Sequence, residues 1–407
     1  MKENSPRHKT DQPQLLRSLT LVEICFYGIG TILGAGIYVL LGEVVNESGM
    51  ATPSAFLLSA LVVSFSAYSY AQMSRHFPCS AGEAVYIMEG LNSRHLSALA
   101  GYAISLGGIV SAATIARGFT GYFAFFSELP PWAIIILLIT TLTILAAWGV
   151  KQSVTIAVIT TLLEIAGLLL VLFVGGDELH GRDIPWREFL PTPDQTLAPV
   201  ISGAFLAFFA FIGFEDMVNM AEEVKNPRRN LPLGIAIALI TSTLLYVAVS
   251  IVAILTLPLS ELANSNAPLA LIIEKNSAVP VELMAAISVV AIINGALIQI
   301  IMVSRVLYGM AEKNLAPLSL KSIHPKTHTP LKATVLTGFI VVSFALWLPI
   351  STLAKTTSSL ILIVFTLVNL SLFVLNYREK KAGISGLFIP AIGACLCASF
   401  LAFQLWN

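Results

Sequence analysis

Long apolar runs are the feature of this sequence that most restricts its fold. A bilayer core is crossed by about 20 apolar residues in a helix, because only a helix or a closed barrel satisfies its own backbone hydrogen bonds in lipid. The chain has 407 residues, 56% of them apolar, and its runs predict eleven membrane-spanning helices. They lie near 19–45, 53–74, 96–126, 131–149, 153–175, 197–220, 231–257, 281–311, 331–350, 352–376 and 385–405.

Charge and cysteine usage exclude several other classes of protein. Only 11% of the residues are charged, and 23 basic residues balance 23 acidic ones, whereas a soluble chain carries about 25% charged residues. The zero net charge argues against nucleic acid as a partner. The four cysteines show neither paired spacing nor a nearby histidine cluster, so we expect no metal site. Nothing in the sequence implies a cofactor.

The distribution of lysine and arginine predicts how the spans are oriented. These residues gather in the cytoplasmic connections of membrane proteins. With the N-terminus placed inside, the outer connections hold only Arg182, Arg187, Lys275 and Lys355. We therefore expect a multi-pass protein of the cell (inner or cytoplasmic) membrane with a cytoplasmic N-terminus. With eleven spans, the C-terminus would lie outside.

Two of the spans contain features that weaken a continuous helix. The first has Gly28, Gly30, Gly34 and Gly36 within nine residues, and each glycine costs a helix about 1 kcal/mol relative to alanine. The sixth span, at 208–216, carries a glycine followed closely by two adjacent acids. Close packing of helices on small residues would also explain the first pattern.

The places of these two spans in the chain favour interrupted helices. They are the first and the sixth, so each opens a block of five spans. Inverted-repeat transporters place discontinuous helices at corresponding positions of their two halves. The sequence thus predicts a cytoplasmic tail at 1–18, repeats at 19–175 and 197–376, and an extra transmembrane helix at 385–405.

Interrupted helices in the membrane would suit an amino acid as ligand. The N-termini of half-helices offer N–H groups and positive dipole ends to a carboxylate. Unwound carbonyl groups attract the amino group. Two broken helices therefore select a zwitterion without requiring many charged side chains.

At these residues the chain resembles the amino acid–polyamine–organocation (APC) superfamily of permeases. The resemblance is carried by GTILGAGIY at 30–38, by FFAFIGFE at 208–215, by AEEVKNPRRNLP at 221–232 and by SRVLYGMA at 304–311. It extends over about 15–378. In span three, Ala116-Arg117 and Gly121-Tyr122 are similar to the cationic amino acid transporter branch and its bacterial relatives.

The resemblance implies a fold and a binding site. The fold is all-α and integral to the membrane, a five-plus-five inverted-repeat (LeuT-like) transporter with discontinuous helices 1 and 6 and an eleventh, peripheral helix. It implies alternating access, commonly with proton coupling. The substrate carboxylate would meet the N–H groups of Ala35 and Gly36, and the amino group would meet backbone carbonyls. The implied substrate-binding positions are Ile32, Gly34, Ala35, Gly36, Phe209 and Ile212. The ring of Phe209 would close over the substrate or serve ordinary packing.

Charged residues inside the spans need an explanation, because each costs at least about 2.5–3.5 kcal/mol to insert. Glu164 lies in the middle of span five, where relatives similar to this chain often have a lysine, and the sequence departs from that pattern. A buried carboxyl group favours its neutral form. Glu164 could therefore carry a proton, bind a sodium ion or a substrate cation, or form a fixed pair with Arg117.

For each of the other charged positions in the spans, the sequence is compatible with two roles. Arg117 would serve a structural pairing, or face the substrate and favour acidic ones. Glu215 and Asp216 would gate a water-filled path, or one of them would cap the second half-helix of span six. Further pocket candidates, whose directions the sequence does not give, are Ser111, Thr114, Asn294 and Gln299.

We therefore expect a secondary active transporter that moves amino acids across the cytoplasmic membrane, coupled to protons, with sodium as the alternative ion. An exchanger of amino acids or polyamines without ion coupling, a transport-inactive substrate sensor on the same fold, and an ion channel stay open. An enzyme is not expected, since the six histidines fall in tails or loops and no HExxH or GxSxG motif occurs. The sequence does not give the particular substrate, the transport mode or the oligomeric state.

Overall fold

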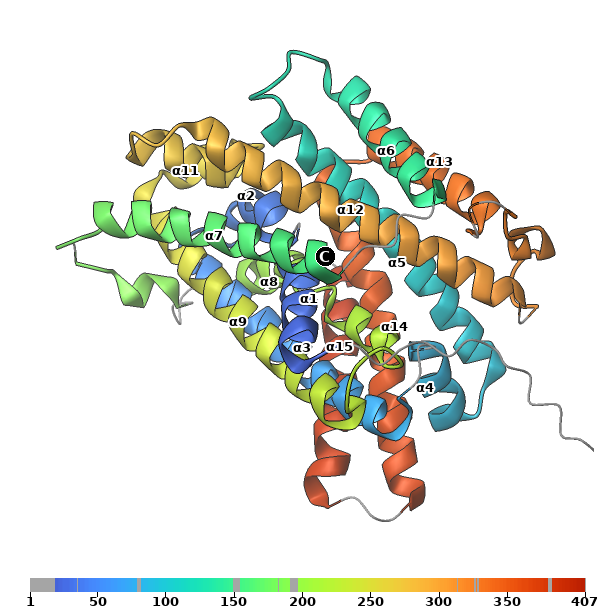
Figure 1. Cartoon of the computed structure of the whole chain (residues 1–407). Coiled ribbons are helices and arrows are strands. Elements are labelled where there is room, and N and C mark those ends of the chain that lie inside the picture. The colour runs from blue at the N-terminus through green and yellow to red at the C-terminus, as the bar shows by residue number, and fades with distance from the viewer. Residues whose placement is uncertain are drawn as a thin grey trace, which may run out of the picture.

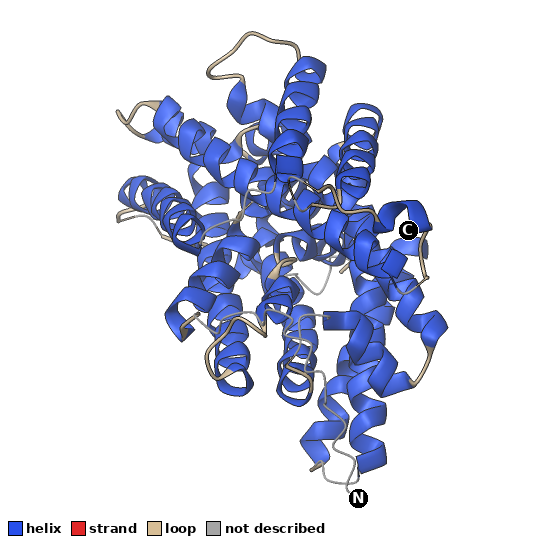
Figure 2. Ribbon diagram, turned by 45° about the vertical axis from the view of Figure 1, so that its right-hand side comes forward, coloured by secondary structure: helices blue, strands red, loops and turns tan. Residues whose placement is uncertain are grey.

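Helices make up nearly all of the ordered secondary structure (Figures 1 and 2). The computed structural model describes residues 19–34, 36–78, 82–148, 154–181, 183–190, 197–312, 314–325, 327, 329–379 and 383–406. Within these ranges no β-strand is present, and a single parallel bridge joins Leu19 to Val224. The bridge ties the start of the first span to the loop that follows the sixth span.

The described helices correspond to all eleven predicted spans. Nine helical stretches are long and apolar enough to cross a membrane. One of them, Leu21–His76, contains the first two predicted spans, and the shorter apolar helix Leu331–Trp347 supplies the ninth. The spans are α1 (Leu21–Leu33) with α2 (Gly36–Ser48), α3 (Thr52–His76), α5 (Arg94–Phe123), α6 (Pro131–Trp148), α7 (Val154–Glu178), α8 (Ala198–Ala210) with η3 (Phe214–Met220), α9 (Pro227–Thr256), α12 (Val281–Glu312), α13 (Leu331–Trp347), α14 (Ile350–Glu379) and α15 (Ile384–Trp406).

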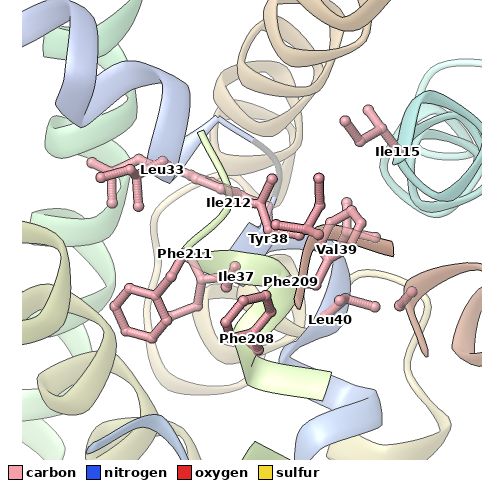
Figure 3. Close-up of a cluster of buried hydrophobic side chains, with 14 of the residues drawn as sticks. Leu33, Ile37, Tyr38, Val39, Leu40, Ile115, Phe208, Phe209, Phe211 and Ile212 are labelled. Atoms are coloured by element: carbon pink, nitrogen blue, oxygen red, sulfur yellow. The ribbon is translucent and has the colours of Figure 1, made fainter. Parts of the chain in front are cut away.

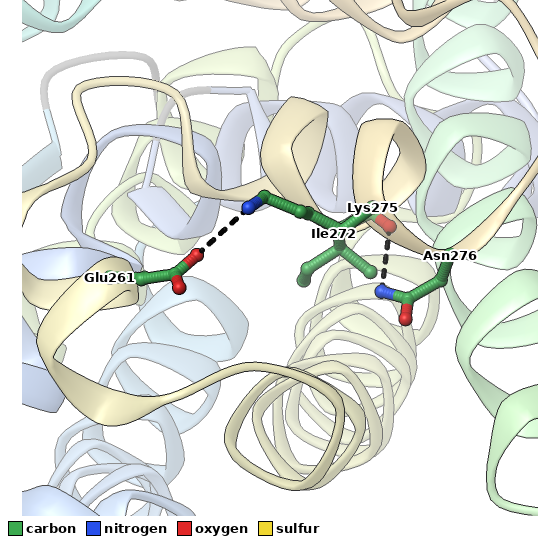
Figure 4. Close-up of polar contacts among 4 residues, drawn as sticks. All are labelled: Glu261, Ile272, Lys275 and Asn276. Atoms are coloured by element: carbon green, nitrogen blue, oxygen red, sulfur yellow. Dashed lines mark hydrogen bonds and ion pairs between the residues drawn. The ribbon is translucent and has the colours of Figure 1, made fainter.

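Short helices occupy some of the connections between the predicted spans. Helix α4 (Gly82–Leu91) follows the second span, while α10 (Leu259–Asn264) and α11 (Pro268–Asn276) follow the seventh. The exposed side chains of Lys275 and Glu261 form an ion pair at 3.4 Å between α11 and α10 (Figure 4). Exposed pairs of this kind contribute about 0–1 kcal/mol, so apolar packing of the short helices holds this connection in place.

Contacts between the helices come in related pairs. Helix α1 packs on α9 as α3 packs on α8, α5 packs on α14 as α12 packs on α7, and α4 packs on α14 as α11 packs on α7. Each contact becomes its partner when spans one to five are exchanged with spans six to ten. Two equivalent five-helix halves produce this pairing. It supports our proposal that the halves are 19–175 and 197–376.

Candidate functional site

The described residues of the first span form two helices, α1 and α2. Helix α1 ends at Leu33 and α2 begins at Gly36. Gly34 keeps helical dihedral angles, and its N–H donates to the carbonyl of Gly30 at 2.9 Å. Because this N–H is already used, Gly34 does not present it to a ligand. The predicted contact at Ala35 lies outside the described residues.

The sixth span also divides into two segments. Helix α8 ends at Ala210, and the N–H groups of Phe211 and Ile212 then make tight turns, bonding the carbonyls three residues back at 3.0 and 3.2 Å. Gly213 follows with φ +128°, a value that side-chain-bearing residues rarely adopt. The 3₁₀ segment η3 begins at Phe214. The glycine is what lets the chain change direction inside the membrane.

The two divided spans meet backbone to backbone. A Cβ placed on Gly213 would lie 2.5 Å from the carbonyl oxygen of Thr31. A Cβ placed on Gly36 would lie 2.3 Å from the Cα of Ala210. Neither approach leaves room for a side chain, so the two glycines bring the ends of α1, α2, α8 and η3 together (Figure 3).

The hydroxyl group of Tyr246, on α9, joins these two spans. It lies 2.7 Å from the carbonyl oxygen of Ile32 and 2.8 Å from that of Ala210, both within hydrogen-bond distance. Both carbonyls belong to the last turn of a helix, where carbonyl groups have no helical partner. Tyr246 was not predicted from the sequence. The available signal was a tyrosine in the middle of an apolar span, since a buried phenol usually finds a hydrogen-bond partner.

Replacing Tyr246 by phenylalanine is expected to raise the substrate concentration for half-maximal uptake about tenfold. The variant leaves buried carbonyls without their donor, which costs about 1–3 kcal/mol, and each 1.4 kcal/mol is tenfold. Initial uptake rates in proteoliposomes measure this. Tyr102→Phe on the exposed side of α5 is the matched control, and an unchanged half-saturation in Tyr246→Phe contradicts the bridging role.

A cavity lies where the two divided spans face spans three and eight. The cavity is narrow, with a volume of about 20 Å³. Phe209, Ile212 and Ile115 appear together in Figure 3. The lining residues are Thr31, Ile32, Gly36, Ser111, Ile115, Phe209, Ile212, Asp216, Gly295, Ile298 and Gln299.

The cavity brings together part of the predicted site. Of the six predicted substrate-binding residues, Ile32, Gly36, Phe209 and Ile212 line it, as do the candidates Ser111 and Gln299. Gly34, Thr114 and Asn294 are not among the lining residues. The carbonyl of Ile32 already accepts from Tyr246, and that of Phe209 from the N–H of Ile212. A carbonyl oxygen has two lone pairs, so each can still receive a ligand.

Glu164 is fully buried in the middle of α7. Its side chain is 0% exposed, and neither carboxylate oxygen has a hydrogen-bond partner among the described residues. The side chain of Asn294 lies close enough to interact with the carboxylate. The hydroxyl of Tyr38 donates to the backbone carbonyl of Glu164 at 2.7 Å. Tyr246 lies close enough to interact electrostatically with the acid.

Arg117 does not pair with Glu164, so that hypothesis is wrong. Its guanidinium Nη1 donates to the carbonyls of Ala345 and Leu348 at 3.0 and 2.6 Å. These carbonyls stand at the C-terminal end of α13, where the last groups lack helical donors and the dipole favours a cation. The end of α13 therefore holds the guanidinium group of Arg117.

The adjacent acids in span six play different parts. The carboxylate of Glu215 accepts from the N–H of Gly213 at 2.8 Å, at the start of η3. Asp216 lines the cavity and is 7% exposed. The described residues hold no group of three or more histidine, cysteine or acidic side chains that could bind a metal.

The fold and the site define a polytopic α-helical membrane protein whose divided first and sixth spans border a cavity. The chain belongs to the amino acid permease family, whose sequence model matches residues 19–407. It is also similar to the solved structure of a Na⁺-coupled sialic acid symporter in a substrate-bound outward-open state. The TM-score is 0.60 at 14% identity, covering 94% of this chain and 90% of the other. The predicted LeuT-like fold class is thereby confirmed.

Curated relatives come from plants and bacteria. The chain is 30% identical to "Cationic amino acid transporter 4, vacuolar" of Arabidopsis thaliana, covering 91% of this chain but 65% of the relative. It therefore spans less than two thirds of that transporter's length. It is 29% identical to the methylthioribose transporter of Bacillus subtilis (strain 168), covering 96% and 91%. It is 28% identical to the branched-chain amino acid permease BcaP of the same organism, covering 97% and 89%.

Proposed function

We propose that the protein is a secondary transporter that carries amino acids across the cell membrane by alternating access. The observation that carries this proposal is the direct contact of the two divided spans beside a cavity. A ligand held there touches helix ends from both halves of the protein. Movement of one half against the other can then open the site to either side of the membrane.

The polarity of the helix ends supports a zwitterionic substrate. The N-terminus of α2, at Gly36, borders the cavity and offers N–H groups and a positive dipole end to a carboxylate. Ile32 and Phe209, at the C-terminal ends of α1 and α8, border the same cavity, and backbone carbonyls at such ends carry negative partial charge. They favour an amino group.

Proton coupling through Glu164 is part of the proposal. A fully buried carboxyl group with no hydrogen-bond partner among the described residues can gain and lose a proton without breaking a fixed ion pair. Tyr246 lies near Glu164 and also bonds the ends of α1 and α8. A change of charge at Glu164 would therefore alter the electrostatic environment of the Tyr246 hydroxyl, which lies between the two divided spans.

Uptake into proteoliposomes tests the function. Radiolabelled neutral, branched-chain and cationic amino acids, with methylthioribose and a polyamine as comparisons, are presented with and without an inward proton gradient. We expect saturable uptake of at least one amino acid, enhanced by the gradient. Uptake that needs an amino acid on the opposite side and ignores the gradient would identify an uncoupled exchanger. Absence of transport for the whole panel contradicts the proposal.

A further inference from the structure

Three buried carboxyl groups gather near the start of η3 in the divided sixth span, and two of them have partners. Glu215 accepts from the N–H of Gly213 at 2.8 Å. Glu83, at the start of α4, is 5% exposed and accepts from the hydroxyl of Tyr70 at 3.2 Å. Asp216 is the third, and it lies close enough to Glu83 for their charges to repel.

The carboxylate of Asp216 has no such partner. No hydrogen bond or ion pair to it is found in the described part of the chain, although its own N–H donates to the carbonyl of Gly213 at 3.1 Å. The side chain is 7% exposed and borders the cavity. It is also the single charged side chain among the described lining residues. An acid buried to this degree is normally paired, so Asp216 is poised for a ligand.

The surroundings of Asp216 favour a cation over an anion. The nearest acids, Glu83 and Glu215, add negative charge, and the carbonyl ends of α1 and α8 border the same cavity. The N-terminus of η3, which could have attracted an anion, is already occupied by the Glu215 carboxylate. Arg305 of α12 lies close enough to Tyr27 to interact with it electrostatically, but it forms no ion pair with Asp216 in the described structure.

We propose that Asp216 binds the ammonium group of the substrate, so that this site recognises the amino group by a carboxylate as well as by backbone carbonyls. The proposal rests on the proposed transport function and deepens it. A carboxylate–ammonium contact in a narrow cavity is a charge-assisted hydrogen bond, the stronger kind. The substrate carboxylate, in contrast, meets the end of α2 and neutral side chains, with no cationic side chain among the described lining residues. Primary amines that lack a carboxylate are therefore ligands, and acids that lack the amino group are not.

Binding of matched compounds to the purified full-length protein tests this. The neutral set is L-leucine, 3-methylbutylamine and 4-methylpentanoate, and the cationic set is L-lysine and 1,5-diaminopentane. Dissociation constants are measured by ligand-dependent thermal stabilisation. In at least one set we expect the amine to bind within about tenfold of its parent amino acid, and 4-methylpentanoate to bind at least tenfold more weakly than 3-methylbutylamine. An acid that binds as well as the amine overturns the proposal.

Substitutions at Asp216 and Glu83 distinguish direct contact with the ammonium group from a long-range effect of negative charge. Asp216→Asn keeps the shape of the side chain and is expected to weaken amine binding at least tenfold, while Asp216→Glu restores part of it. Glu83→Gln removes the same charge from a neighbour that does not line the cavity, and we expect less than a threefold change. Equal losses in Asp216→Asn and Glu83→Gln, or wild-type binding by Asp216→Asn, overturn the proposal. Because wild-type uptake is measured separately, failure here leaves the transport function standing.

Discussion

Replacing Glu164 by glutamine is expected to abolish accumulation driven by a proton gradient while exchange of substrate continues. One proton moving down a gradient of one pH unit releases about 1.4 kcal/mol, enough for about tenfold accumulation. Glutamine has nearly the same shape but cannot carry a proton. In the variant, the internal substrate concentration should therefore rise only until it equals the external concentration, even with a proton gradient present.

The burial of Glu164 makes this substitution informative. Its side chain is 0% exposed, and the described residues offer its carboxylate oxygens no hydrogen bond that the amide would break. Glutamine is also less costly than glutamate to bury, so the fold should tolerate it. A loss of coupling would then report the missing proton and not a collapsed site.

Glu261→Gln is the matched control for this experiment. Glu261 forms the exposed pair with Lys275, and its loss is expected to change neither accumulation nor exchange. Accumulation is measured as the ratio of internal to external label at steady state, and exchange as counterflow without a gradient. A Glu164→Gln variant that still accumulates substrate to the wild-type ratio contradicts proton carriage by Glu164.

The apolar runs were sufficient to predict the spans, because crossing a bilayer imposes a minimum length on each helix. The run at 131–149 became Pro131–Trp148, and the run at 385–405 became Ile384–Trp406. Helix α4 was missed since its ten residues are too few to cross a membrane. Short connections obey no comparable length rule, so sequence gives little warning of helices within them.

The divided spans could be located from sequence because glycine marks both of them. The tight approaches of Gly36 and Gly213 lie at the predicted positions. The hydrogen-bond partners of the charged side chains were harder to predict from the sequence, since they depend on which helix ends come close in space. Arg117 was paired with Glu164 because both are charged, but the carbonyls at the end of α13 are its partners. No pattern within span three points to α13.

The roles of Glu215 and Asp216 illustrate the same limit. They are adjacent acids that the sequence pattern does not distinguish. In the structure, Glu215 accepts from the N–H of Gly213, whereas Asp216 borders the cavity. The positive φ of Gly213 sets the direction of the backbone at this point. A single sequence did not reveal which acid would be left for a ligand.

Gly213→Ala is expected to lower substrate affinity on the order of a hundredfold. The residue has φ +128°, which strains any side-chain-bearing residue, and its new Cβ would lie 2.5 Å from the carbonyl oxygen of Thr31. Backbone strain of this kind costs about 1–3 kcal/mol, and about 3 kcal/mol corresponds to roughly a hundredfold. The obstacle is backbone, so relief requires the two divided spans to separate and the cavity between them to change.

Gly36→Ala tests the same contact from the other side, because its Cβ would lie 2.3 Å from the Cα of Ala210. Gly309→Ala in α12 is the control, since an added Cβ there meets no atom within 4 Å. Each variant is compared with the wild type by substrate affinity and by unfolding temperature. Wild-type affinity in both Gly36→Ala and Gly213→Ala would show that the two spans do not need this close contact.

The double variant discriminates further. Substitutions at independent sites add their free energies, whereas substitutions that disturb one contact do not. If Gly36 and Gly213 hold a single junction, the first alanine already separates the spans and the second costs little more. We therefore expect an affinity loss in the double variant well below the product of the two single losses. Multiplicative losses would mean that each glycine acts on its own span, and a ligand bound there would not link the two halves.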